Sequence, residues 1–128
     1  MRFLAIYKTP ETGVPPTAAQ MAEMGRFIEE VSRAGVLLET GGCLPSAQGA
    51  RVRLAGGKMT VTDGPFTESK ELVAGYAVLQ TKNKEEAVEW TKRFLRVAGD
   101  GESEIRQVFE AGECSGQVEP KMEAVGGH

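Results

Sequence analysis

Asp63 is the residue whose type and setting most directly suggest chemistry in this sequence. It opens the tetrapeptide Asp63-Gly64-Pro65-Phe66, where a carboxylate can act as a general base or anchor a ligand. Asp-Gly-Pro is equally strong turn chemistry, because aspartate caps local N–H groups and proline fixes its own φ at about −65°. Both interpretations of Asp63, catalytic base and turn residue, stay open. Phe66 likewise is either a hydrophobic plug or one wall of a ligand pocket.

Tyr7 and Tyr76 are the candidates for ligand binding. Each lies in a segment rich in apolar residues, and a buried tyrosine hydroxyl needs a hydrogen-bond partner, which a ligand, a water or Asp63 can supply. A core tyrosine whose hydroxyl reaches water explains both residues as well. The only histidine is His128, the last residue. Any proton transfer must therefore use carboxylates, these tyrosines or lysines.

The cysteines and the histidine do not form a recognisable metal site. Cys43 and Cys114 are too far apart in sequence for a metal-binding motif, and His128 stands alone, so we expect no metal. Two free thiols in a cytoplasmic protein are the favoured interpretation, with a disulfide as the alternative.

The composition limits the possible partners. The chain has 128 residues and a net charge of −3, with its lysines and arginines scattered, so we expect one domain and no nucleic-acid partner. No apolar run approaches the roughly 20 residues of a membrane span, so we expect no membrane partner either.

The elements that position these residues follow from hydrophobic periodicity and from helix-capping signals. Thr17 with Gln20, and Asn83 with Glu86, have the capping-box spacing that opens a helix. The order strand, helix, strand, hairpin, strand, helix, strand predicts a ferredoxin-like α+β sandwich of two βαβ units with an inserted β-hairpin. The expected strands are residues 2–8, 36–42, 71–81 and 103–111, the expected helices 18–34 and 84–98, and the hairpin 50–62.

The hairpin turns at Gly56-Gly57, which can adopt the positive φ of a two-residue turn. Its strands alternate, which predicts one buried apolar face and one face toward water or a partner. The expected buried residues are Val52, Leu54, Met59 and Val61, and the others are Arg51, Arg53, Thr60 and Thr62.

Two of the expected strands, 2–8 and 71–81, are apolar on both faces. In a ferredoxin-like fold the helices cover only one face of the sheet, so the other apolar face needs a second cover. A homodimer that packs two sheets face to face is the economical solution.

The chain resembles the YCII-related family, in its DGPF-domain branch. The resemblance extends over residues 1–110 and rests on "RFLAIYK", "EMGRFIEEVSRAGVLLETGG", "GGKMTVTDGPFTESKELVAGY" and "EIRQVFE". It implies a ferredoxin-like monomer that pairs into a dimeric α+β barrel. Residues 1–111 would form this domain, and residues 112–128 a tail that is flexible or ordered by a partner.

The resemblance brings no established activity, but it places the chain beside cofactor-free enzymes of the same superfamily. We therefore expect a small-molecule ligand in the barrel, either simply bound or turned over by a cofactor-independent enzyme, and no cofactor. Asp63 would be the catalytic residue, and Tyr7, Phe66 and Tyr76 would bind the ligand. Some YCII-type relatives carry a His–Asp pair, which this chain lacks because His128 is its only histidine.

Two further functions stay open. Family members are often encoded beside extracytoplasmic-function sigma factors, so the alternative is a regulatory protein-interaction partner in such a pathway. A purely structural dimer, whose Asp63 turn is only a turn, is the third.

Overall fold

The computed structural model describes residues 1–110 and has the α+β architecture that the sequence predicts. The strands are β1 (Arg2–Thr9), β2 (Leu37–Gly42), β3 (Ala50–Ala55), β4 (Lys58–Asp63), β5 (Leu72–Gln80) and β6 (Glu102–Gln107). The helices are α1 (Ala18–Arg33) and α2 (Lys84–Ala98), and a short 3₁₀ helix spans Ser46–Gln48.

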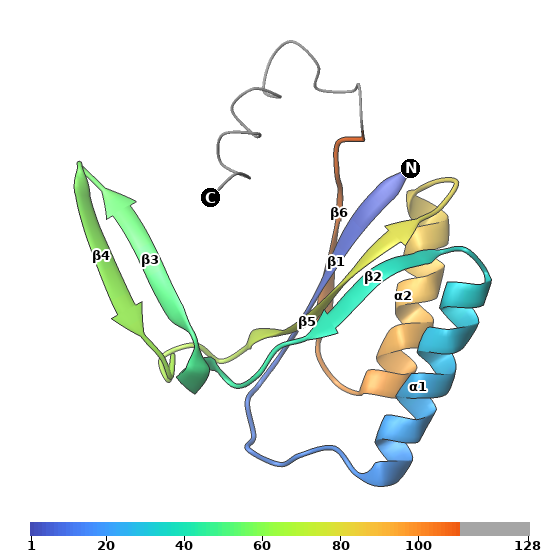
Figure 1. Cartoon of the computed structure of the whole chain (residues 1–128), viewed down its shortest axis with the longest axis horizontal. Helices are drawn as coiled ribbons and strands as arrows, with labels where there is room; N and C mark the ends of the chain where they lie inside the picture. The colour runs from blue at the N-terminus through green and yellow to red at the C-terminus, as the bar shows by residue number, and fades with distance from the viewer. Residues whose placement is uncertain (111–128) are drawn as a thin grey trace.

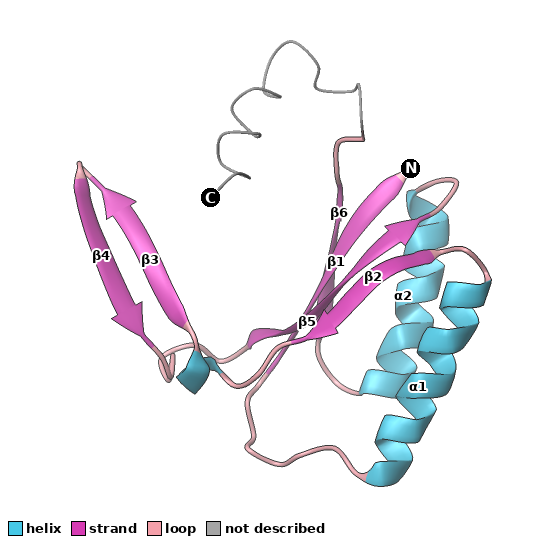
Figure 2. Cartoon of the chain, viewed as in Figure 1, coloured by secondary structure: helices cyan, strands magenta, loops and turns pink. Residues whose placement is uncertain are grey.

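Four strands form one antiparallel sheet in the order β2-β5-β1-β6, which is the ferredoxin-like order. Both helices lie against the same face of this sheet (Figure 1). Strands β3 and β4 pair only with each other and project on the opposite side of the sheet from the helices (Figure 2).

Both helices begin where the capping signals predict. Thr17 and Gln20 form a complete capping box at the start of α1, and the Asn83 side chain accepts a hydrogen bond from the Glu86 backbone N–H at the start of α2. After α1, Gly35 has a φ of 75°, the left-handed conformation that ends many helices.

The hydrophobic core lies between the sheet and the helices. It consists of Phe3, Val31, Val36, Leu79 and Ala87. Phe3 of β1 lies directly opposite Leu79 of β5, so the two central strands bring these side chains together beneath the helices.

The other face of the sheet carries the alternate residues of each strand, and we call it the open face. It is formed by Leu4, Ile6 and Lys8 of β1, Val73, Tyr76 and Val78 of β5, Glu39 and Gly41 of β2, and Glu102, Glu104 and Arg106 of β6. Simple alternation over residues 71–81 would put Val73 on the same face as Leu79, but a register shift opposite Tyr7 and Lys8 moves it onto the open face.

The hairpin differs from its prediction. Its turn and its two-faced pairing are confirmed, but the apolar residues are not buried: Val52, Leu54, Met59 and Val61 are 68%, 64%, 60% and 65% exposed. The reason is that the two strands pair only with each other and that no helix or other strand of residues 1–110 makes an extensive contact with them.

The last strand is shorter than predicted, ending at Gln107, and Phe109 is exposed. The tail predicted for residues 112–128 lies outside the described residues. Within residues 1–110, no helix combines the length and apolar character needed to cross a membrane.

Candidate functional site

The Asp63–Phe66 turn is held by close backbone packing at Gly64. The Gly64 N–H donates to the Gly49 carbonyl oxygen at 2.9 Å. A Cβ atom at position 64 would lie 1.7 Å from the Ser46 carbonyl oxygen. Only glycine therefore fits where the turn meets the Ser46–Gln48 segment.

Glu11 and Ser46 anchor this turn from outside the hairpin. The Glu11 carboxylate accepts hydrogen bonds from the Ser46 backbone N–H at 2.6 Å and from the Ser46 hydroxyl at 2.8 Å. The same hydroxyl oxygen accepts a bond from the Phe66 N–H at 3.1 Å. Three distant segments of the chain are thus joined at the half-buried base of the hairpin.

The Asp63 side chain takes no part in this network. It is exposed at the end of β4, and it forms no hydrogen bond or ion pair with any of residues 1–110. The expected capping of local N–H groups by Asp63 is therefore wrong. Glu11 and Ser46, which hold the turn, are distant from it in sequence, so no local pattern around Asp63 points to them.

Phe66 carries the Arg51 guanidinium on its ring, 3.9 Å from the ring centroid. Arg51 also donates to Glu68 and, at 3.1 Å, to the Ser69 hydroxyl. A backbone hydrogen bond and then the bond from Arg51 hold the pKa of Glu68 below its ordinary value. Arg51 is therefore held at the base of the hairpin.

An open pocket of about 520 Å³ lies beside this base, and Phe66 is one of its walls. Asp63, Tyr7 and Tyr76 are not among its lining residues. The pocket is lined by Glu11, Cys43, Leu44, Pro45, Ser46, Gln48, Gly49, Arg51, Phe66, Leu72 and Val73.

Tyr76 and Glu39 form a hydrogen-bonded pair on the open face. The Tyr76 hydroxyl donates to Glu39 Oε2 at 2.7 Å. The Tyr76 ring lies against Gly41, where a Cβ atom would be 2.8 Å from the ring, so glycine makes room for this orientation. The hydrogen bond to Glu39, and then its negative charge, raise the pKa of Tyr76 above its ordinary value, so the phenol keeps its proton at neutral pH.

A second polar group lies toward the opposite edge of the open face. Lys8 Nζ donates to Glu104 at 3.0 Å, and Arg106 donates to the same carboxylate at 3.2 Å. The bond to Glu104 raises the pKa of Lys8, and the bond from Lys8 lowers the pKa of Glu104. Both side chains are therefore charged at neutral pH.

An apolar strip separates the two polar groups. Leu4 lies opposite Val78, and Ile6 lies between Tyr76 on β5 and Glu104 on β6. Neighbouring strands are about 4.8 Å apart, so these polar groups are roughly 10 Å apart across the strip. This open face can accept a flat apolar molecule with a hydrogen-bonding group at each end.

The pocket and the open face adjoin at the end of β2. Cys43 follows this strand, and its N–H donates to the Ala74 carbonyl oxygen at 2.8 Å. Cys43 and Val73 line the pocket, and Val73 also belongs to the open face. The pocket at the hairpin base and the open face of the sheet therefore form one continuous surface for a ligand.

Tyr7 lies on the helix side of the sheet. Its ring meets Phe94 of α2 edge to face, with centroids 5.2 Å apart. Its hydroxyl lies within hydrogen-bonding distance of the Gly99 and Asp100 carbonyl oxygens, at 3.2 and 3.0 Å. The structure thus brings Tyr76 to the open face and Phe66 to the adjoining pocket, but it places Tyr7 away from both.

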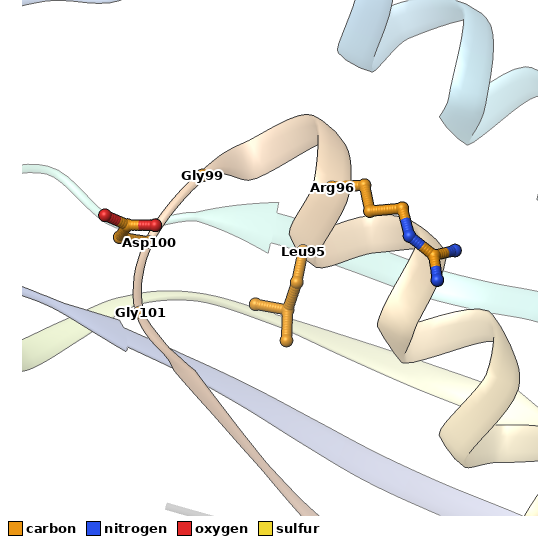
Figure 3. A pocket seen from close by; sticks show the side chains of 5 residues that line it. All are labelled: Leu95, Arg96, Gly99, Asp100 and Gly101. Atoms are coloured by element: carbon orange, nitrogen blue, oxygen red, sulfur yellow. The ribbon is translucent and has the colours of Figure 1, made fainter.

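A second hollow of about 410 Å³ lies at the end of α2 (Figure 3). Arg96 and Asp100 line it, but their side chains point apart, and Leu95 points toward the sheet. Because these polar groups do not converge, this hollow has no arrangement suited to chemistry. Among the residues that the structure describes, no cluster of three or more His, Cys, Asp or Glu side chains could hold a metal ion.

The sequence matches the model of the YCII-related domain over residues 1–111. The chain belongs to the YCII-related family. No curated protein matches the sequence. A similar solved structure is the 5-chloro-2-hydroxyhydroquinone dehydrochlorinase TftG from Burkholderia phenoliruptrix AC1100, in complex with 2,5-dihydroxybenzoquinone. The alignment covers 87% of this YCII-related chain and 96% of TftG, with 12% identity and a TM-score of 0.54, so it shows a shared fold.

We predict that Ser46→Ala destabilises the fold and Asp63→Ala does not. Losing the Ser46 hydroxyl removes the bonds to Glu11 Oε1 and from the Phe66 N–H, which should cost about 1–2 kcal/mol and lower the unfolding midpoint by roughly 3–8 °C. Asp63→Ala should change stability by less than about 0.5 kcal/mol. Thermal unfolding of both variants at one protein concentration tests this, and an equal loss in Asp63→Ala would contradict it.

Gly64→Ala and Gly25→Ala should have opposite effects on stability. The new Cβ at position 64 would overlap the Ser46 carbonyl oxygen and force a backbone shift, at a cost of about 1–3 kcal/mol. At exposed Gly25 in α1 the Cβ meets nothing within 4 Å, so alanine should stabilise the helix by about 0.5–1 kcal/mol. Chemical unfolding measures both, and a neutral Gly64→Ala would show that the turn does not need this close packing.

The Tyr76 phenol should titrate above its ordinary pKa of 10.0. Tyr7→Phe leaves Tyr76 as the only tyrosine, so ultraviolet absorbance follows its ionisation alone. Adding Glu39→Gln should move the midpoint down toward 10.0 because the hydrogen bond to the carboxylate is weakened and the negative charge is gone.

The same raised pKa of Tyr76 sets the sign of a stability effect. The folded state holds the proton more tightly, so this contribution is complete below the unfolded pKa and is lost as the pH rises through the folded pKa. If the titration midpoint of Tyr76 does not respond to Glu39→Gln, the Tyr76–Glu39 pair does not form in solution.

Proposed function

We propose that this chain binds a small, largely apolar molecule on the open face, and that two copies enclose the molecule by pairing these faces as a dimeric α+β barrel of the DGPF branch. The observation that carries the proposal is the Tyr76–Glu39 pair beside the strip of Leu4, Ile6 and Val78. A hydrogen-bonded acid–base pair at the edge of an apolar sheet face has the composition of a ligand site.

Pairing of two copies would strengthen the chemistry of this face. Covering it removes water from Tyr76 and Glu39, and lower local polarity makes their hydrogen bond stronger. It also covers an apolar surface that the helices leave open. One event would therefore stabilise the sheet and complete the ligand site.

Each polar residue of the open face has a role in this proposal. Glu39 is the general base, and Tyr76 orients its carboxylate through the 2.7 Å hydrogen bond. Lys8, held by Glu104, supplies a positive charge for an anionic group of the ligand. Proton transfer between such groups needs no cofactor. Asp63 stays a second candidate base, because its exposed carboxylate is not engaged by residues 1–110.

The structural relative suggests a first probe. TftG is named a dehydrochlorinase and holds 2,5-dihydroxybenzoquinone. That compound is flat and has oxygen atoms at opposite ends, so it offers hydrogen-bonding groups to both sides of the apolar strip. At 12% identity the relative supports the choice of probe through the fold alone.

The other expectations stay predictions. These are the regulatory role in a sigma-factor pathway, the cytoplasmic location, and the absence of nucleic-acid and membrane partners. The polar pairs on the open face favour the small-molecule proposal over a purely structural dimer, because a structural interface would not need them.

Tyr76→Phe should weaken binding of 2,5-dihydroxybenzoquinone and of related hydroxylated aromatic acids, measured by isothermal titration calorimetry. We expect a loss of about tenfold, the effect of one hydrogen bond near a charged group. Glu39→Gln should have a similar effect, because it weakens the same pair.

Tyr7→Phe is the matched control, since it removes the same hydroxyl from the helix side of the sheet. It should leave the affinity for these compounds unchanged. Binding that depends on Tyr7 but not on Tyr76 or Glu39 would contradict the proposed site, and so would a complete absence of binding across the series.

A further inference from the structure

The β3–β4 hairpin, which we call the arm (residues 50–63), is a ribbon with two different faces. Cross-strand pairs Val52–Val61 and Leu54–Met59 form one wholly aliphatic face. The other face consists of the pairs Arg51–Thr62, Arg53–Thr60 and Ala55–Lys58. This strict alternation is typical of a sheet with one covered face and one solvated face.

The aliphatic face of the arm is left uncovered by residues 1–110. Its four side chains are each at least 60% exposed, together an apolar surface on the order of a few hundred Å². An isolated two-stranded ribbon is marginally stable in water. Burial of the aliphatic face would therefore stabilise the arm.

The arm is also held firmly at its base. Gly64 packs on Ser46, and Arg51 is fixed by Phe66, Glu68 and Ser69. These contacts hold the strands on the side of the sheet away from the helices (Figure 1). An arm projecting in a set direction is suited to reach a neighbouring molecule.

We propose that the aliphatic face of the arm packs on a second copy of this chain. A stable interface needs about 800 Å² from each partner, more than four side chains supply. The open face lies on the same side of the molecule as the arm and carries the additional apolar strip of Leu4, Ile6 and Val78. One second copy covers both surfaces. A second copy is also the one partner whose concentration always equals that of the arm itself.

This packing connects the dimer with the ligand site. Gly49 and Arg51, at the base of the arm, line the 520 Å³ pocket that adjoins the open face. A second copy seated on the arm fixes the position of that pocket wall. The inference rests on the proposed function only in that the same second copy covers the open face.

Val61→Lys and Thr60→Lys form the matched test. Both residues are exposed, β-branched neighbours on β4, and they point to opposite faces of the arm. Val61→Lys should raise the dimer dissociation constant at least about tenfold in sedimentation equilibrium of the full chain, while Thr60→Lys changes it by less than roughly threefold. Far-ultraviolet circular dichroism checks that both variants are folded.

Trypsin gives a second measurement that needs no variant. Arg53 and Lys58 lie on the arm, and cleavage after them should slow as the wild-type concentration rises through the dimer dissociation constant. Cleavage independent of concentration in a range where dimers form would contradict packing of the arm.

The outcomes separate this inference from the proposed function. A dimer that tolerates Val61→Lys as well as Thr60→Lys overturns the role of the arm and leaves pairing through the open face intact. A wild-type chain that stays monomeric overturns both the arm inference and the proposed pairing of open faces. Another cover, such as residues 111–128 or a different protein, would then occupy the aliphatic face. Ligand binding that fails in a dimer sensitive to Val61→Lys overturns only the proposed function.

Discussion

The antiparallel pairing of β1 with β5 is the constraint on which the rest of the structure depends. Because side chains alternate across a strand, this single register sends Phe3 and Leu79 beneath the helices. The same register sends Ile6 and Tyr76 to the open face. The core and the candidate site are thus two sides of one pairing, and a shift of one residue would exchange them.

The sequence around Asp63 has a structural function, but a different one from that suggested by the aspartate. The essential feature is the missing side chain of Gly64, which lets the turn approach Ser46. Glu11 then holds Ser46, whose hydroxyl holds Phe66. This packing fixes the direction of the arm and positions Phe66 as one wall of the pocket. A local backbone requirement therefore shapes both the surface proposed to pack on a second copy and the surface proposed to bind a ligand.

The chemistry of the open face comes from residues that are distant in sequence. Tyr76 meets Glu39 because β2 and β5 are neighbours, and Gly41 leaves space for the tyrosine ring. Lys8 meets Glu104 because β1 and β6 are neighbours. In each pair the hydrogen bond to the partner, and then the partner's charge, sets the direction of the pKa change, so strand order decides which groups shift one another.

Local patterns in the sequence by themselves determined the helices, the hairpin turn, the two-faced strands and the order of these elements along the chain, because capping, glycine turns and periodicity act over a few residues. Tertiary structure alone decided that Tyr7 lies beneath the helices and that Glu39 meets Tyr76. It also decided that the other elements of residues 1–110 leave the aliphatic face of the arm exposed. These outcomes depend on which strands are neighbours and on their register, and neither is encoded in the spacing of residues along one segment.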